Sequence, residues 1–449
     1  MDHRGAALIS RFVLFAAATA SVASLVQASP PLGAEQLRMQ SAEFRREVIQ
    51  VSKGVHVAVG YSASNVTLIQ GQDGVIIVDT GTDPIDAQAI RAAFGPLLNG
   101  PVRAIIYTHS HPDHTGGSRV FANRDAPQIW SHASLLAAAP DLGRANRDGG
   151  DQFGIALPAD QFINAGVQQQ FGRLTPPTRE GYIPPNHTFT ADRRNLKLAG
   201  IPVTLFHTPG ESQDTIAVWL PDRRVVIAGD NLLRSFPNVA PIRGARFRSP
   251  EDWITSLNRI LSLHAEALVP GHTRPILGSV AVSAVTTAYR DGIQSILQQT
   301  LAGIRNGERP DELVTHVRLP AELESNPWLA EFYGSVEWLV RGIYADRLGW
   351  FDGNAAGLFP LSSRDRAARL LPLLGERSGV IAKAQQALAV GDYRWAAELA
   401  DLILALKPAD QEARILKADA LTALAEQQMN AIARNYYLTV AQSLRKLPD

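Results

Sequence analysis

Three histidines and one aspartate lie within six consecutive positions, and this cluster constrains the chain more than any other feature. The residues are His109, His111, Asp113 and His114, and they directly follow the apolar run 102–107. Such a run has the length and composition of a buried strand, whose rigid end lets the next side chains converge. Neutral imidazole and carboxylate together suit a divalent ion such as zinc. The chain has only 11 histidines in 449 residues, so three of them within six positions are not expected by chance.

Composition narrows the class of protein and the chemistry of the site. A length of 449 residues predicts two or three domains. Hydrophobic residues make up 45% and charged residues 19%, as in ordinary globular proteins. The 43 Lys and Arg residues balance 43 Asp and Glu residues, so charge gives no reason to expect a nucleic-acid partner. Because there is no cysteine, a metal site must be built from His, Asp and Glu.

Residues 1–28 have the pattern of a secretory signal peptide. Arg4 and Arg11 precede an apolar segment, and a small-x-small sequence ends at Ala28. The alternative is an N-terminal membrane anchor, but the run is short and rich in alanine and serine, which favours cleavage. We therefore predict a secreted or periplasmic protein that has no membrane association after cleavage.

Short strand signals alternate with helix patterns up to about residue 279, which predicts sheets covered by helices. Residues 141–194 are rich in Gly and Pro pairs, and we interpret them as an insertion that is either a substrate lid or a purely structural excursion. From about residue 280 long helical patterns dominate, and residues 391–408 resemble a tetratricopeptide-type helix pair. The predicted strands are 55–59, 65–69, 75–79, 102–107, 196–198, 203–206, 215–220, 225–230 and 267–269.

Three further candidate ligands follow apolar runs later in the chain. Glu211, Asp230 and His272 each lie in or beside a glycine-containing turn. Together with the first cluster they make seven donors, too many for one tetrahedral ion. Seven donors suit two ions bridged by a carboxylate and a hydroxide, which would ionise water and polarise a substrate. The sequence therefore predicts a dinuclear hydrolytic site.

The order of these motifs resembles the metallo-β-lactamase superfamily over roughly residues 50–275. The resemblance implies an αββα sandwich with two Zn²⁺ ions, or another divalent metal, at one edge of its two sheets. It also implies that Asp79 orients the first cluster through a hydrogen bond. Its ligand assignment gives His109, His111 and Glu211 to the first ion, Asp113, His114 and His272 to the second, and Asp230 to both.

The chain departs from the usual superfamily pattern at position 211. Most members have histidine directly after Thr-Pro-Gly, whereas this chain has Glu211. The additional negative charge favours a harder ion or a tighter pair of ions. Alkylsulfatases of the superfamily place a glutamate one residue later, and their bridging ligand is Glu where this chain has Asp230. The chain is thus similar to a relative of that group.

Two more stretches resemble alkylsulfatases. Residues 236–244 place Arg243 thirteen residues after Asp230, the spacing of that group's sulfate-binding arginine. A planar guanidinium suits sulfate, and the alternative is an ordinary surface arginine. Residues 337–354 resemble the helical dimerisation domain, which implies a homodimer. Alkylsulfatases usually carry a further sterol-carrier-like domain, and without it long-chain substrates are expected to be disfavoured.

These observations predict a signal peptide over 1–28, a metallo-β-lactamase-like catalytic domain over 29–279 and a helical dimerisation domain over 280–449. The expected function is an exported dinuclear zinc hydrolase that releases sulfate from alkyl sulfate esters with a metal-bound hydroxide. The predicted catalytic residues are Asp113 and Arg243, and the predicted substrate contacts are Arg243, Tyr182 and Asn186.

Two other functions stay open at this point. A β-lactamase or another ester or lactam hydrolase would use the same site, because the same nucleophile attacks a carbonyl carbon. The partner is a small molecule in either case. A helical interaction protein with an inactive hydrolase domain is a third possibility, and the complete set of seven donors argues against it.

Overall fold

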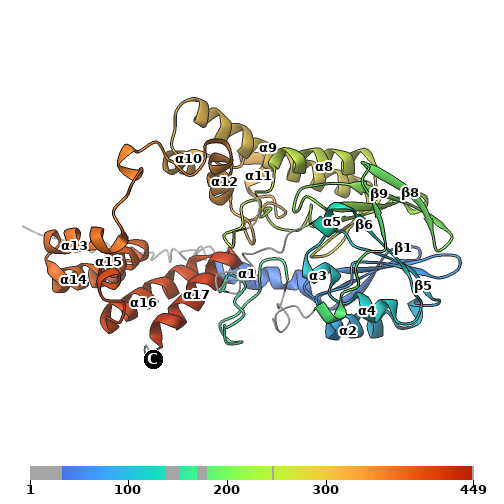
Figure 1. Cartoon of the computed structure of the whole chain (residues 1–449), viewed down its shortest axis with the longest axis horizontal. Coiled ribbons are helices and arrows are strands. Elements are labelled where there is room, and N and C mark those ends of the chain that lie inside the picture. The colour runs from blue at the N-terminus through green and yellow to red at the C-terminus, as the bar shows by residue number, and fades with distance from the viewer. Residues whose placement is uncertain (1–32, 138–150, 169–178, 245–246, 447–449) are drawn as a thin grey trace, which may run out of the picture. The chain divides into compact units, whose positions relative to one another are not determined.

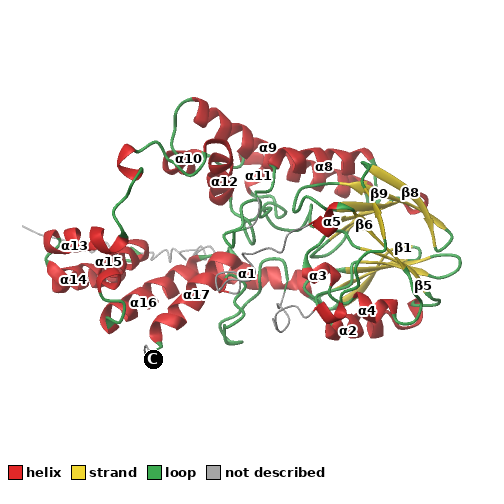
Figure 2. Ribbon diagram, viewed as in Figure 1, coloured by secondary structure: helices red, strands yellow, loops and turns green. Residues whose placement is uncertain are grey.

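The computed structural model describes residues 33–137, 151–168, 179–244 and 247–446, so the predicted signal peptide lies outside the described residues. Two mixed sheets face each other and carry helices on their outer faces, and a series of helices follows (Figures 1 and 2). This arrangement confirms the predicted sandwich and the helical region after it. Among the described helices, none combines the length and apolar character that crossing a bilayer requires.

The first sheet has seven strands that are neighbours in chain order. The first four pair antiparallel, and β4 to β7 pair parallel. Parallel pairing brings the C-terminal ends of β4 and β5 to the same edge of the sheet. The strands are β1 (Glu47–Ser52), β2 (Val55–Val59), β3 (Val66–Gln70), β4 (Val75–Val78), β5 (Val102–Ile106), β6 (Gln128–His132) and β7 (His187–Phe189).

The second sheet has six strands in the order β13-β12-β11-β10-β9-β8. All its pairs are antiparallel except β11 with β12. That parallel pair again places two strand ends together, and a predicted metal ligand follows each end within two residues, Asp230 after β11 and His272 after β12. The strands are β8 (Arg193–Leu198), β9 (Ile201–His207), β10 (Ile216–Leu220), β11 (Val225–Gly229), β12 (Ala267–Pro270) and β13 (Ile276–Leu277).

Burial on both faces explains why the central strands are continuous apolar runs. In β4, Ile76 and Val78 belong to the core between the sheets, whereas Val75 and Ile77 face outward. The outward side chains pack under α2 (Pro84–Phe94) and α4 (Ser118–Ala122). On the second sheet, α8 (Pro250–Ser262) contributes Trp253, Leu257 and Ile260 to the outer core.

The helical region shares this outer core. Tyr289 and Ile293 of α9 (Ser279–Arg305) belong to the same buried cluster as Trp253 of α8 and Leu268 of β12. The cluster continues to α12 (Val336–Leu348). The predicted boundary at residues 279/280 therefore coincides with the start of α9, but it does not divide the hydrophobic core.

The remaining helices are short in the N-terminal half and form packed hairpins near the C-terminus. Aspartate or asparagine caps start α15, α16 and α17, with a side-chain oxygen accepting from a backbone N–H. These helices are α1 (Gly33–Gln40), α3 (Pro112–Thr115), α5 (Ser134–Ala137), α10 (Pro310–His316), α11 (Ala321–Glu324), α13 (Ser363–Leu373), α14 (Glu376–Ala389), α15 (Tyr393–Leu406), α16 (Gln411–Gln427) and α17 (Ala431–Arg445).

The insertion predicted over 141–194 is too long, because β7 and the start of β8 lie within it. Residues 151–168, which are one of its described parts, pack on α17 near the C-terminus. Arg434 donates to the Gln161 carbonyl at 2.7 Å, and Asn435 donates to the Asn164 carbonyl at 3.1 Å. These buried contacts favour the structural interpretation of residues 151–168 over a mobile lid.

Asn430 joins α17 to the loop after α11. Its Nδ2 donates to the carbonyls of Glu331, Tyr333 and Gly334 at 3.0–3.2 Å, while Oδ1 accepts from Ala433 N. Replacing it in N430A leaves buried carbonyls unpaired and removes a helix cap, so we expect the free energy of unfolding to fall by about 2 kcal/mol or more in urea titrations.

N430D keeps the oxygen that caps α17 but places a carboxylate against three carbonyl oxygens. Its free energy of unfolding should therefore fall by at least as much as that of N430A. D392A, which removes only the cap of α15, should cost about 1 kcal/mol. An N430D variant as stable as the unaltered protein would contradict this account of the junction.

Candidate metal centre

The candidate ligands lie where strands of both sheets end at a common edge. His109 follows β5, Asp230 follows β11, His272 follows β12, and Glu211 lies in the loop between β9 and β10. Two backbone hydrogen bonds fasten the sheets to each other at this edge. Ile216 N donates to the carbonyl of Thr108, and Asn65 N donates to that of Gly271, both at 2.7 Å.

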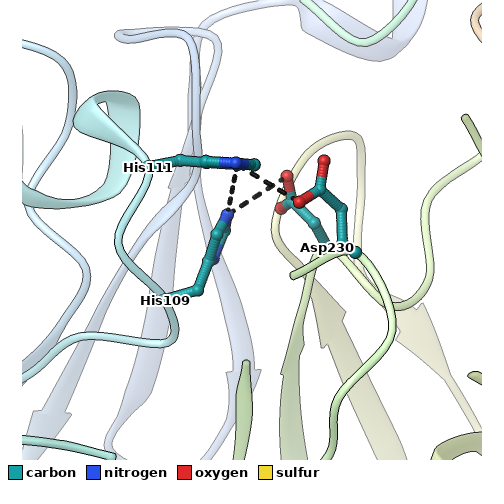
Figure 3. Close-up of side chains that lie close together, drawn as sticks. His109, His111 and Asp230 are labelled. Atoms are coloured by element: carbon teal, nitrogen blue, oxygen red, sulfur yellow. Dashed lines mark hydrogen bonds and ion pairs between the residues drawn. The ribbon is translucent and has the colours of Figure 1, made fainter. Parts of the chain in front are cut away.

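The structure brings all seven predicted donors together as two groups whose ligand atoms lie within 4.8 Å of one another. In the first group, His109 and His111 point toward Asp230 (Figure 3). His109 Nε2 lies 2.8 Å from His111 Nδ1, and His111 Nδ1 lies 3.2 Å from Glu211 Oε2. The first group is His109, His111, Glu211 and Asp230, and the second is Asp113, His114 and His272.

Asp230 contacts both groups. Its Oδ2 lies 3.8 Å from His109 Nε2 and 3.1 Å from His272 Nε2, and its Oδ1 lies 3.3 Å from His114 Nε2. The carboxylate of Asp113 completes the second group at 3.5 Å from His114 and 3.6 Å from His272. This placement suits Asp230 as a ligand shared by two ions.

Hydrogen bonds outside the cluster fix the imidazoles. Asp79 accepts from His114 Nδ1, Thr108 N and Thr108 Oγ1, all at 2.8 Å, which confirms its predicted orienting role. His272 Nδ1 donates to the Ala63 carbonyl at 2.7 Å. In both histidines the second nitrogen, Nε2, faces the carboxylate of Asp230, at 3.3 Å in His114 and 3.1 Å in His272.

The chemistry of this donor set fits a divalent cation. Among the described residues, the buried atoms His114 Nε2 and Asp230 Oδ1 have no hydrogen-bond partner, although they face each other. A divalent cation bound among these donors would offset the negative charge of the buried carboxylates. Gly271 is required here, because a Cβ at that position would lie 1.9 Å from Asp230 Oδ1.

Burial and charge act on the imidazoles in opposite directions. Burial lowers the pKa of His109 to about 3. Burial also acts to lower the pKa of His114 and His272, but the nearby carboxylates, Asp230 foremost, outweigh it. The pKa of His114 is therefore raised well above the ordinary value, and that of His272 is also raised.

Arg248 is a member of the site that the sequence did not reveal. Its Nη1 lies 2.6 Å from Glu211 Oε1 and donates to the Asn238 carbonyl at 2.7 Å. Arg248 and Glu211 are 4% and 5% exposed, so this ion pair is buried. Asn238, also missed, is 2% exposed, and its side-chain amide has no hydrogen-bond partner within the described ranges.

Arg243 is buried, at 2% exposed, so the surface-arginine alternative is wrong. Its guanidinium carbon lies 5.8 Å from the ring centroid of Phe153, a residue that sequence reasoning also missed. The loop that carries Arg243 is held by the helical region. Phe236 N donates to the Ala330 carbonyl at 2.7 Å, and Ala240 packs so closely on α12 that only Gly342 fits beneath it.

The structure does not bring Tyr182 and Asn186 to this cluster. The ring of Tyr182 lies 5.9 Å from that of Tyr107 and packs in the outer core of the first sheet. Asn186 accepts from Ile129 N at 2.7 Å and donates to the Pro127 carbonyl, near the start of β6. Because the site lies at the opposite, C-terminal ends of the parallel strands, Asn186 holds the sheet edge instead of contacting substrate.

Known proteins resemble both halves of the chain. Residues 59–272 match the family model described as metallo-beta-lactamase superfamily, and residues 309–447 match the one described as alkyl sulfatase dimerisation. A linear primary-alkylsulfatase from Pseudomonas sp. (strain ATCC 19151) is 35% identical over 391 residues, which cover 84% of this chain and 73% of the relative.

Two further comparisons agree. Another linear primary-alkylsulfatase from Pseudomonas sp. is 29% identical, with 89% of this chain and 61% of the relative covered. The solved structure of the stereoselective inverting sec-alkylsulfatase Pisa1 from Pseudomonas sp. superimposes with a TM-score of 0.83 at 26% identity, covering 89% of this chain and 66% of that one. The chain thus spans less than two thirds of these two proteins.

The raised histidine pKa values predict how metal-free protein responds to pH. Protons on His114 and His272 stabilise the fold fully below the ordinary histidine pKa of 6.5, and this stabilisation is lost as pH rises through the raised folded-state pKa values. We expect the melting temperature of metal-free protein to fall as the pH rises above about 6.5, and added Zn²⁺ to raise it more at higher pH.

D230N is the matched control, because it removes the charge that most raises both pKa values. Its metal-free melting temperature should change less over the same pH range. Identical profiles for D230N and the unaltered protein would show that these protons do not control stability.

Proposed function

Because the chain belongs to the alkylsulfatase branch of the metallo-β-lactamase superfamily, we propose that it hydrolyses alkyl sulfate esters to an alcohol and inorganic sulfate. The proposed site holds two divalent cations, with zinc as the expected ion. His109, His111 and Glu211 would hold the first cation, Asp113, His114 and His272 the second, and Asp230 both. When bound, such a pair lowers the pKa of water and polarises a sulfate ester.

The observation that carries this proposal is the buried Arg243 on a loop that is tied to the metal centre. A buried guanidinium can make paired, charge-assisted hydrogen bonds to an oxyanion in an environment that water does not screen. Arg248 contacts both Glu211 and the Asn238 carbonyl, so the loop 236–244 adjoins the first group of ligands. A sulfate ester fits this combination of a cation pair and a planar donor fork better than a lactam does.

The protein's own residues would have distinct tasks. Arg243 would bind the sulfate oxygens, and the ring of Phe153 beside it would hold the guanidinium plane. The Asn238 amide would supply a further donor on the same loop. Asp79 would keep His114 in the tautomer that presents Nε2 to the site.

A substrate panel tests the proposal directly. Protein loaded with Zn²⁺ is assayed with linear and secondary alkyl sulfates, phosphate esters and lactams, and sulfate release is measured. Turnover of alkyl sulfates alone supports the proposal, whereas turnover of lactams without sulfate release would replace it with the alternative hydrolase.

Arg243→Met should lower kcat/KM for sulfate esters by roughly 100-fold or more, because one preorganised donor group facing the developing charge is removed. Arg243→Lys keeps the positive charge but not the planar pair of donors. Its kcat/KM should therefore lie between the values of the unaltered protein and R243M. Zinc content, measured by mass spectrometry, should not change. R341M, at an exposed ion pair on α12, is the control and should keep full activity. An R243M variant with undiminished turnover would contradict the assignment.

Export through the N-terminal segment and homodimerisation are part of the same proposal. The dimer is supported by an exposed apolar segment that runs from the last residue of α12 to the start of α13, inside the range that matches the dimerisation model. A second copy of the chain is the proposed cover, because apolar groups this exposed are costly in a monomer. The segment comprises Leu348, Trp350, Leu358, Phe359 and Leu361, which are 47–96% exposed.

The double variant W350S/F359S should shift the protein from dimer to monomer, because it removes the two largest apolar side chains of this segment. Molar mass is measured by size-exclusion chromatography with light scattering. V280S, which alters an equally exposed apolar residue on α9, should leave the dimer intact. A dimer that persists in W350S/F359S would rule out this segment as the interface.

A further inference from the structure

The buried ion pair between Arg248 and Glu211 occupies the position where the chain departs from most of its superfamily. Nη1 of Arg248 lies 2.6 Å from Glu211 Oε1, and the two residues are 4% and 5% exposed. Glu211 therefore does not enter the metal centre as an isolated carboxylate. It enters as half of an ion pair that the solvent does not screen.

The pair leaves one particular oxygen for the metal centre. Oε1 faces the guanidinium, whereas Oε2 lies 3.2 Å from His111 Nδ1, among the donors of the first group. The backbone of Glu211 is fixed as well, because its N–H donates to Asn231 Oδ1 at 3.1 Å. Glu211 thus presents a single oxygen in a fixed direction, as a histidine presents a single nitrogen.

We propose that Arg248 is a positioning residue that makes Glu211 act as a one-oxygen ligand and offsets its charge. The Arg248–Glu211 pair is neutral overall, so the first-ion site has the formal charge that it would have with a neutral imidazole at position 211. This inference rests on the proposed metal site.

The proposal has an unusual consequence for substitution. Histidine at position 211 would supply a good zinc ligand, yet it would remove the carboxylate that lies 2.6 Å from the buried Arg248 guanidinium. Removing one partner of a buried ion pair is strongly unfavourable, and the guanidinium would then also repel the metal. In this chain the usual superfamily ligand should therefore work only if Arg248 is neutralised too.

The same guanidinium fastens the loop that carries the proposed sulfate ligand. Arg248 donates to the Asn238 carbonyl at 2.7 Å, and Asn238 lies on the loop that leads to Arg243. Glu211 and this loop are therefore held by one side chain. A change at Arg248 should reach both the first ion and the loop, whereas a change at Arg243 should leave the metal untouched.

A four-member variant cycle tests the proposal: unaltered protein, E211H, R248M and E211H/R248M. Zinc affinity is measured by competition with a chromophoric chelator, and folding by circular dichroism. In E211H, the more weakly bound of the two zinc ions should bind roughly 10- to 100-fold less tightly than in the unaltered protein. The double variant E211H/R248M should recover most of the lost zinc affinity. If E211H does not fold, recovery of folding in E211H/R248M supports the proposal in the same way.

Other outcomes overturn it. Zinc binding by E211H that equals the unaltered protein's would show that Arg248 does not set the charge of the site. Additive losses in E211H/R248M would show that Arg248 is only a packing residue. R248K keeps the charge and should retain more affinity than R248M, and the reverse order would also refute the proposal. Failure of the unaltered protein to bind zinc would instead refute the metal site itself.

Discussion

The structure depends on holding four imidazoles and three carboxylates together, away from water, at one edge of two sheets. Buried carboxylates repel one another, and neither sheet could place them alone, because β5 lies in one sheet and β11 and β12 lie in the other. The two sheets are joined at this edge by backbone hydrogen bonds, Ile216 N to Thr108 and Asn65 N to Gly271. These bonds fix the distance between the donors of the two sheets. The geometry of the metal centre therefore depends on the packing of the sandwich.

A second set of contacts then orients each donor. His114 is held by Asp79, His272 by the carbonyl of Ala63, and Glu211 by Arg248. Each contact uses the atom that does not face the cluster, so each of these three ligands presents one atom toward the cluster. Metal sites typically lose much of their metal affinity when such outer partners are removed. These partners are therefore important for function although they do not contact substrate.

The parts of this site that follow strand ends were predictable from the sequence, and the parts made by distant packing were not. The seven predicted metal ligands follow apolar runs, and a strand end fixes where the next side chains lie. Arg248 carries no such signal, because it reaches Glu211 from a loop 37 positions later. Phe153 reaches Arg243 only because residues 151–168 pack on α17, almost 300 positions away in the chain.

The wrong predictions have related causes. Tyr182 and Asn186 are predicted to contact substrate, yet the stretch that contains them supplies the edge strand β7. Three residues are too few for a strand pattern to be recognised, so its polar neighbours looked like loop residues. The boundary at residue 279 marks a real change from strands to helices, but periodicity carries no information on whether two segments share a core.

That shared core bears on how a metal-binding sandwich acquires an anion site. The seven metal donors all come from the sandwich, whereas the loop carrying Arg243 rests on α12 at Gly342 and on the segment around Ala330. The same segment is held by Asn430 at the start of α17. A sandwich without these helices would keep its metal ligands but lose the support beneath Arg243. The helical region is therefore part of the proposed sulfate site, and its conformation should matter for sulfate binding more than for metal binding.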